Sequence, residues 1–283
     1  MRIRSRRRAL LSGATVWLAA ALLASGTATA TPPTSQRLAT VSSNWAGYAV
    51  SGPTARFRSV SAHWVQPSVT CAGRSGYSGF WVGLGGYHRA SDALEQMGTE
   101  ADCSPSGEAR YFAWYELVPK SPVDLRLAIH PGDGIATSVT VSGHRVRLAL
   151  RDLTTRASYV TTQRASAIDV SSAEWIAEAP SVCYGQNCRV LPLADFGSVP
   201  FSAASATATS GHKGSISDPA WSLNTLELLG AGGGLGPARF GSSAATTAAT
   251  PTSLTSAGSA FAVDWQQASA PPETPGRTGP FAA

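Results

Sequence analysis

The sequence lacks the motifs by which most hydrolases are recognised. It contains no H-E-x-x-H and no G-x-S-x-G, the usual signatures of zinc peptidases and of α/β-hydrolase nucleophiles. No aspartate stands in an Asp-Thr-Gly or Asp-Ser-Gly triplet, and the 5 histidines lie in unrelated contexts. The sequence therefore implies no metal and no other cofactor, and any hydrolytic chemistry must use less common groups.

Long apolar runs are missing beyond the first 30 residues. Those residues have the order of an export signal: five arginines between Arg2 and Arg8, an apolar run over 14–24, and the cleavage pattern Ala28-Thr29-Ala30. A Sec signal and a twin-arginine signal both fit this order. The sequence predicts a signal peptide over residues 1–30, a secreted protein, and no membrane contact once the signal is removed.

Lysine is nearly absent, since only Lys120 and Lys213 occur. The whole chain has 22 Lys+Arg and 17 Asp+Glu. Five of the arginines and none of the acids belong to the signal, so the remaining chain is formally neutral. A neutral chain argues against nucleic acid as a partner, because phosphate backbones are bound by an excess of basic groups.

The four cysteines form no C-x-x-C pair, and no histidine lies close to them in sequence, so a structural zinc site is a poor interpretation. An even number of cysteines in an exported chain predicts two disulfides. Pairing Cys183 with Cys188 around a turn-forming tetrapeptide is the simplest of three connectivities, and it leaves Cys71 with Cys103.

Helical periodicity is absent after the signal, and short strand patterns alternate with turn residues. We expect one all-β domain over 41–266, between a short extension (31–40) and a flexible tail (267–283). About twelve strands at this spacing predict a sandwich or a barrel. The expected strands are 42–50, 57–65, 80–83, 94–99, 110–118, 135–141, 145–151, 159–163, 173–178, 196–204, 221–228 and 260–265.

Two segments, 205–220 and 230–258, are rich in Ala, Ser, Thr and Gly and are expected to be surface loops. The glycine tract at 230–236 could in principle cradle phosphate. It lacks the Lys-Ser/Thr of a P-loop, and no helix is expected after it, so the loop interpretation is preferred.

Several segments combine tryptophan, glycine and acid or amide groups. In chain order they are Ser43-Asn44-Trp45-Ala46-Gly47, Trp81-Val82-Gly83-Leu84-Gly85-Gly86, Leu94-Glu95-Gln96-Met97-Gly98, Ala113-Trp114-Tyr115-Glu116, Ala173-Glu174-Trp175-Ile176 and Ala194-Asp195-Phe196-Gly197. This ordered set resembles the glutamic peptidases of family G1, the eqolisins. The resemblance covers about residues 40–205, with a fainter match near 261–265. It implies two antiparallel sheets packed as a concanavalin A-like, or lectin-like, sandwich.

The resemblance also implies the site. The family's catalytic glutamate falls on Glu174 and its glutamine on Gln96, while groove residues fall on Trp45, Trp81, Trp114 and Glu116. Two positions depart from the family pattern: Gly85 replaces an aspartate, and Met97 replaces a threonine. The surroundings of Gln96 are therefore where this chain should differ from its relatives.

The chemistry can be argued from the residue types alone. Peptide hydrolysis without a metal or a covalent nucleophile needs an activated water, and a carboxylate such as Glu174 can accept its proton and pass one to the leaving amine. Apolar neighbours would raise the pKa of Glu174. A primary amide such as Gln96 offers two N–H donors, which suit a developing oxyanion.

Other readings of these residues stay open. Glu95 alternates with Gln96 and is expected to face solvent, whereas Glu100 shares the Gln96 face and could be a second groove carboxylate. Each tryptophan could belong to the core, and Asp195 with Phe196 is expected to shape a turn. The leading prediction is a monomeric peptidase acting on polypeptides. The alternatives are a carbohydrate-binding or glycoside-hydrolysing sandwich, which would pair Glu174 with Glu100 or Glu116, and a non-catalytic relative.

Overall fold

The computed structural model describes residues 39–88, 90–184, 187–229, 247–255 and 257–267. These ranges contain strands and loops but no helix, and hence no helix that could cross a membrane. They belong to one compact unit, Arg37–Ala283. The predicted signal, most of the predicted extension and almost all of the predicted tail lie outside the described residues.

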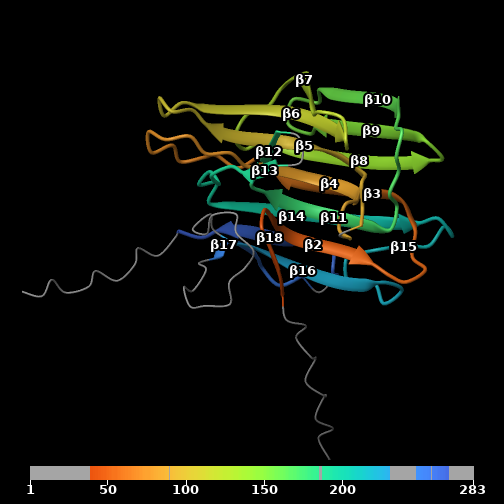
Figure 1. Ribbon diagram of the computed structural model, residues 1–283. Helices are drawn as coiled ribbons and strands as arrows, with labels where there is room; N and C mark the ends of the chain where they lie inside the picture. Colours follow the sequence, from red (N-terminus) through yellow and green to blue (C-terminus); the bar gives the residue numbers. More distant parts are fainter. Residues whose placement is uncertain (1–38, 89, 185–186, 230–246, 256, 268–283) are drawn as a thin grey trace, which may run out of the picture. The chain divides into compact units, whose positions relative to one another are not determined.

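Most strands belong to one hydrogen-bonded path that folds back on itself into two layers (Figure 1). The fold-back lies between β17 and β16, and contacts across the layers join β14 with β11, β3 with β4, β8 with β5, and β10 with β7. The path runs β10-β9-β8-β3-β14-β18-β17-β16-β2-β11-β4-β5-β6-β7.

In the first layer, side chains along a strand alternate between the core and solvent. The clearest case is β8, in which every second side chain from Ile135 to Val141 is buried. Its strands are β3 (Phe57–Val65), β8 (Gly134–Ser142), β9 (Arg145–Asp152), β10 (Ser158–Arg164), β14 (Ser198–Ala208), β15 (Lys213–Gly214), β17 (Thr247–Pro251) and β18 (Phe261–Trp265).

The second layer holds the strands that carry the predicted site. A separate hairpin, β12 (Ser181–Tyr184) with β13 (Asn187–Val190), follows its central strand β11. The strands of this layer are β1 (Thr40–Ser42), β2 (Trp45–Ser51), β4 (Gly79–Gly85), β5 (Leu94–Cys103), β6 (Ala109–Leu117), β7 (Val123–Ala128), β11 (Ser172–Glu178) and β16 (Ser222–Leu229).

The main core fills the space between the layers. Trp64 and Phe201 enter it from the first layer and Trp175 from the second, and all three are fully buried. The indole N–H of Trp175 donates to the Ser61 carbonyl oxygen at 2.9 Å, which links β11 to β3 across the sandwich. The predicted all-β, two-layer antiparallel sandwich is thereby confirmed.

A second apolar cluster covers the outer face of the second layer. Because this cluster packs on one face and the main core on the other, β2, β4, β5 and β11 are buried along nearly their whole length. The fully or almost fully buried members of the second cluster are Ala49, Trp81, Leu94, Trp114, Ile176 and Leu226.

The loop prediction was wrong in part. Residues 205–208 end β14, 213–214 form β15, and 247–251 form β17, since the backbone at these positions pairs with neighbouring strands. The tract 230–246 lies outside the described residues. Strands β7, β12 and β13 were not expected. Both disulfides are confirmed: Cys71 pairs with Cys103, and Cys183 with Cys188 across the β12–β13 hairpin.

Candidate active site

One transverse row of residues crosses six neighbouring strands of the second layer. It consists, from β16 to β6, of Asn224, Ala49, Glu174, Gly83, Gln96 and Glu116. Glu174 and Gln96 thus lie on the same face, separated by the single residue Gly83 on β4. Two strand spacings place their Cα atoms about 10 Å apart, a distance that two long side chains can close from either side.

Gly83 has no side chain of its own, and the side chains of Trp81, Leu94 and Gln96 pack closely over it. A Cβ atom on Gly83 would lie 2.9 Å from Cζ3 of Trp81, 3.0 Å from Cδ1 of Leu94 and 3.3 Å from Cβ of Gln96. Any larger residue would therefore push against the apolar cluster and the amide. On the other side of Glu174, the residue in the row is Ala49, whose side chain is also small.

Glu174 is fully buried, and neither carboxylate oxygen has a hydrogen-bond partner in the described part of the chain. Burial raises the pKa of Glu174 well above its ordinary value, the charges of Asp169 and Glu95 add to that rise, and the nearby Ser172 hydroxyl opposes it. Burial therefore favours the neutral form of this carboxyl in the substrate-free protein.

Gln96 is held through the nitrogen of its side-chain amide. Nε2 donates to Oε2 of Glu116 at 2.7 Å, whereas the buried Oε1 has no partner among the described residues. Burial raises the pKa of Glu116, and the hydrogen bond from Gln96 partly offsets this effect. The contact with Glu116 fixes the amide plane and leaves the second N–H of Nε2 free.

A groove of about 640 Å³ opens beside this row. Its floor includes Gln96, Glu100, Trp114 and Glu116, and Trp45 stands at its side. The walls come from residues 118–122, which connect β6 to β7, and from residues 180–183 at the start of the disulfide-closed hairpin. Glu174 does not line this groove, because it lies beneath the apolar cluster.

The three predicted tryptophans occupy different places. Trp45 and Trp114 line the groove, whereas Trp81 is fully buried beneath it and meets the edge of Trp45 at a centroid distance of 5.0 Å. Trp45 also reaches the β4–β5 turn, where a Cβ on Gly86 would lie 3.3 Å from its Cη2. The ring of Trp45 therefore contacts Trp81, before Gly83 in the chain, and lies close to Gly86, after it.

Glu178 is a groove residue that the sequence analysis missed. It accepts hydrogen bonds from Nε1 of Trp81 at 2.7 Å and from Nδ2 of Asn44 at 2.8 Å, so it fixes the tryptophan layer. Burial raises its pKa to about 7 despite those hydrogen bonds. Its position four residues after Glu174 on one strand was the available signal, since even spacings share a face.

Glu100 lies in the groove, on the same face of β5 as Gln96. It is paired with Gly79 on β4, and Gly79 is paired on its other side with Glu178 on β11. Burial raises its pKa, and so do the charges of Asp102 and Glu178. Asp102, two residues further along β5, also has a raised pKa because of burial. The groove therefore collects carboxyl groups that favour their neutral form.

The expectation that Glu95 faces solvent was wrong. It points away from Gln96 as alternation requires, but it is fully buried, with Leu84 and Leu117 opposite it on the neighbouring strands. Burial raises its pKa to about 8, and neither oxygen completes a hydrogen bond within the described ranges. Met97, one of the two departures, lies on the same core face and does not touch the groove side of Gln96.

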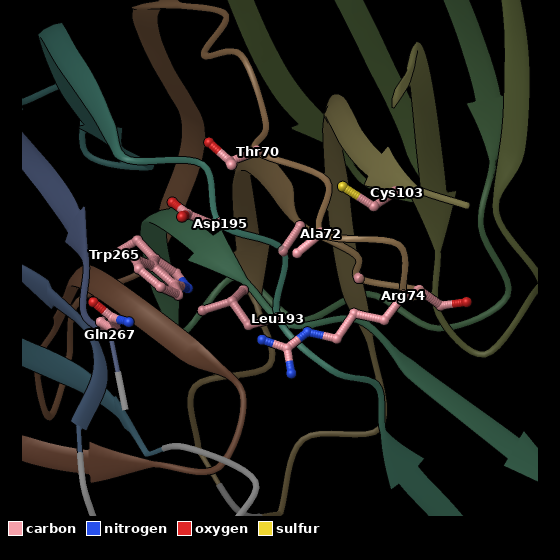
Figure 2. A pocket seen from close by; sticks show the side chains of 11 residues that line it. Thr70, Ala72, Arg74, Cys103, Leu193, Asp195, Trp265 and Gln267 are labelled. Carbon is pink, nitrogen blue, oxygen red and sulfur yellow. The ribbon is translucent and has the colours of Figure 1, made fainter. Parts of the chain in front are cut away.

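A smaller concavity of about 240 Å³ lies beside the Cys71–Cys103 disulfide. Figure 2 shows Arg74 extending across it toward Leu193, with Asp195 and Trp265 on the opposite wall. It contains none of the predicted catalytic or groove residues. Asp195 accepts a hydrogen bond from the Gly197 N–H at 3.1 Å, which fits the expected turn. Among the described residues no group of three or more His, Cys, Asp or Glu is arranged to hold a metal ion.

Comparisons with known proteins agree with the fold. The crystal structure of scytalido-glutamic peptidase with a peptide-based transition state analog matches at a TM-score of 0.64 and 25% identity, covering 80% of this chain and 100% of that one. SCP-B, a member of the eqolisin family in complex with the tripeptide Ala-Ile-His, matches at 0.60 and 24%, with the same coverage. Aspergilloglutamic peptidase from Aspergillus niger matches at 0.51 and 24%, covering 68% and 99%.

Among curated protein sequences, none matches the chain. The family model described as the Peptidase A4 family matches residues 43–227, which span all the predicted site residues and most of the sandwich. The chain therefore belongs to the Peptidase A4 family, the glutamic peptidases or eqolisins, and is a glutamic endopeptidase.

Proposed function

We propose that this peptidase is a secreted acid endopeptidase in which Glu174 activates the attacking water and Gln96 stabilises the oxyanion. The observation that carries the proposal is the transverse row: both side chains stand on one face of the sheet, separated only by Gly83. Each also keeps a buried oxygen without a hydrogen-bond partner in the described residues. Buried groups without partners are uncommon and are characteristic of functional sites.

The groove offers room for an extended polypeptide. Solved relatives bind a peptide-based transition state analog in one case and a tripeptide in another. For this chain we place the peptide along the groove between the 118–122 wall and the 180–183 wall, with the scissile carbonyl directed at Gln96. Trp114 and Trp45 supply flat apolar surfaces for its side chains.

Glu174 performs the proton transfers. In its ionised form the carboxylate accepts a proton from water as the water oxygen bonds to the carbonyl carbon, which gives a tetrahedral intermediate. The protonated carboxyl then gives a proton to the leaving nitrogen as the C–N bond breaks, and the carboxylate is restored. A raised pKa makes Glu174 a stronger base, and such general acid–base catalysis typically contributes roughly 10²–10⁴-fold.

Gln96 acts on the oxyanion. One N–H of its amide is used by Glu116, so the amide plane is fixed before substrate arrives. The other N–H is available to the carbonyl oxygen as it becomes negative. A donor that is already oriented needs no reorganisation during the reaction, which is the condition under which such donors are most effective.

Access to Glu174 requires a local movement. The carboxyl is fully buried, and the side chains of Trp81 and Leu94 lie closest over the neighbouring Gly83. Trp45, which packs on Trp81, is only partly buried and its indole nitrogen has no hydrogen-bond partner among the described residues, so its rotation would break packing contacts but no hydrogen bond. Binding of a peptide in the groove would supply the compensating contacts.

A cleavage assay tests the proposed function. The protein without residues 1–30 is incubated with a denatured protein from pH 2 to pH 7, and peptides are identified by mass spectrometry. We expect internal cleavage at acidic pH that is insensitive to pepstatin and to metal chelators. No cleavage at any pH would contradict the proposal. Hydrolysis of a polysaccharide that survives Gln96→Ala would indicate a glycoside hydrolase instead.

Secretion is tested separately. When the full chain is expressed in a bacterium with Sec and twin-arginine pathways, the mature protein should be found outside the cytoplasm with its amino terminus near Thr31. Replacing Arg6 and Arg7 by lysine should block export only if the twin-arginine route is used. Cytoplasmic accumulation of the uncleaved chain would contradict the predicted signal.

A further inference from the structure

We infer that Asp169 is a positioning residue of the active site and supplies, from the β10–β11 connection, the carboxylate that is missing at Gly85. This inference rests on the proposed function of Glu174. The Gly85 departure removed an acid from the end of β4, and a residue 84 positions later in sequence stands in its place.

The first argument is spatial. Gly85 has a φ of 85°, and a Cβ built on it would lie 2.6 Å from Cβ of Asp169 and 2.7 Å from its carbonyl oxygen. The side chain of Asp169 therefore starts almost where a side chain at position 85 would start. The two cannot coexist, since real Cβ atoms do not approach others this closely. Glycine at 85 is the condition that admits Asp169.

The second argument is the set of hydrogen bonds that holds the carboxylate. Oδ2 of Asp169 accepts from the Gly86 N–H at 3.3 Å and from the Ser91 hydroxyl, both in the β4–β5 connection. Oδ1 accepts from the Ser171 N–H at 2.8 Å, which closes a turn just before β11. One carboxylate thus ties the end of β4 to the start of the strand that carries Glu174.

The third argument is electrostatic. Burial opposes ionisation of Asp169, but the hydrogen bonds from Ser91, Ser171 and Gly86 outweigh it, so the pKa of Asp169 is lowered. Asp169 is therefore a fixed negative charge over most of the acidic range. That charge raises the pKa of Glu174 and also that of Glu95. In this way Asp169 keeps the proton on Glu174 to higher pH.

The other titratable groups near Asp169 are few. Glu174 and Glu95 face it from β11 and β5, and His88 with Asp92 lines the same shallow surface depression on the β4–β5 connection. Asp92 makes no hydrogen bond to Gly86 or Ser91, although it belongs to the same connection. Asp92→Asn is therefore a matched control for Asp169→Asn.

The experiment is a titration of Glu174 in the protein labelled with ¹³C at the glutamate side-chain carboxyls, with Glu174→Gln used to assign its signal. We expect Asp169→Asn to move the Glu174 titration to lower pH while Asp92→Asn leaves it in place. The limb of the kcat/KM profile that reports Glu174 should move by the same amount and in the same direction. Asp169→Ala, which also loses the hydrogen bonds, should lower kcat further.

Two outcomes separate this inference from the proposed function. An unchanged Glu174 titration in folded Asp169→Asn would overturn the inference, whatever the activity. A shifted titration in a protein that cleaves no peptide would support the role of Asp169 and contradict the proposed use of Glu174. If Asp169→Ala fails to fold, Asp169→Asn still decides the question, because the amide keeps the shape of the side chain and one acceptor oxygen.

Discussion

The outer faces of the two layers are built from the same kind of strand but differ in what they bury. On β9 of the first layer, Arg145, Arg147 and Arg151 point to solvent while Val146, Leu148 and Leu150 fill the core. On β11 of the second layer, both faces are covered, and Glu174 lies among apolar side chains. The first face is a solvated surface, and the second is a concealed site.

The difference is clearest in how charge is treated. The two ion pairs within the described ranges both join a histidine to an aspartate, so none involves a glutamate of the second layer. For Glu95, Glu100, Glu116, Glu174 and Glu178, burial instead raises the pKa and so favours the neutral form. Burying acids without cations costs less stability when they are protonated than when they are charged, and this condition suits an enzyme that works in acid.

The largest effect is expected on the concealed face, at the catalytic carboxyl. Glu174→Gln removes the proton acceptor without changing the shape of the side chain, so kcat/KM should fall roughly 10²–10⁴-fold. Cleavage of a fluorogenic peptide measures the loss, and thermal unfolding confirms the fold. Glu108→Gln, at an exposed site, is the matched control and should keep full activity. Equal activity in the two variants would refute the assignment.

The next effect compares the same kind of substitution in the two layers. Gln96→Ala removes the proposed oxyanion donor and should lower kcat/KM by roughly 10²–10³. Gln163→Ala on β10, whose amide donates to Thr161 and to no other described residue, should leave kcat/KM unchanged. Steady-state kinetics of both variants provide the comparison. A similar loss in both would show that the effect of Gln96→Ala is structural.

A smaller loss of activity is expected from adding a side chain at Gly83, which lies between Glu174 and Gln96. Gly83→Ala places a methyl group against Trp81 and Leu94 and should lower kcat roughly 10- to 100-fold, because it displaces the groups around Glu174 and Gln96. Gly79→Ala is the control on the same strand and face, where a Cβ would meet its nearest atom at an ordinary 3.7 Å. Full activity of Gly83→Ala would mean that the close packing over Gly83 does not position Glu174 and Gln96.

Stability should depend on pH in the direction set by the buried acids. The pKa values of Glu95 and Glu178 are raised to about 8 and about 7, so between pH 4.5 and 8 the folded chain binds more protons than the unfolded chain. The free energy of unfolding should therefore be highest in acid and decline on the order of a few kcal/mol as pH rises through that window. Urea unfolding at pH 4 and pH 8 measures this, and Glu95→Gln should flatten the decline. Greater stability at pH 8 would reverse the sign and contradict the account.

Strands with alternating polar and apolar residues could be predicted from the sequence. The burial of a side chain could not, where it depends on which other parts of the fold cover that face. The strands at 135–141 and 145–151 were expected because one face is polar, and the structure has them at Gly134–Ser142 and Arg145–Asp152. Glu95 was misplaced because alternation fixes which face a side chain takes but not whether that face is covered. The short strand β17 was taken for a loop because its alanines and threonines carry no apolar pattern of their own.

The site shows the same division. The facing of Glu174, Gln96 and Glu100 follows from period two and from the family resemblance, and the structure places them accordingly in sequence-distant strands of one sheet. The roles of Glu178 and Asp169 could not be assigned from sequence, although the spacing of Glu178 from Glu174 predicts that these two share a face. Their roles depend on a fold in which β11 lies beside β4, so that one reaches the groove tryptophans and the other reaches Gly85.

The most direct test of the central claim is a double-mutant comparison at Glu174 and Gln96. If the two act as a unit on one reacting carbonyl, their losses should not be additive in free energy, so Glu174→Gln with Gln96→Ala should lose much less activity than the product of the two single losses. Values of kcat/KM for the parent, both single variants and the double variant decide this. Single losses that multiply in the double variant, or a single variant with parental activity, would contradict the account.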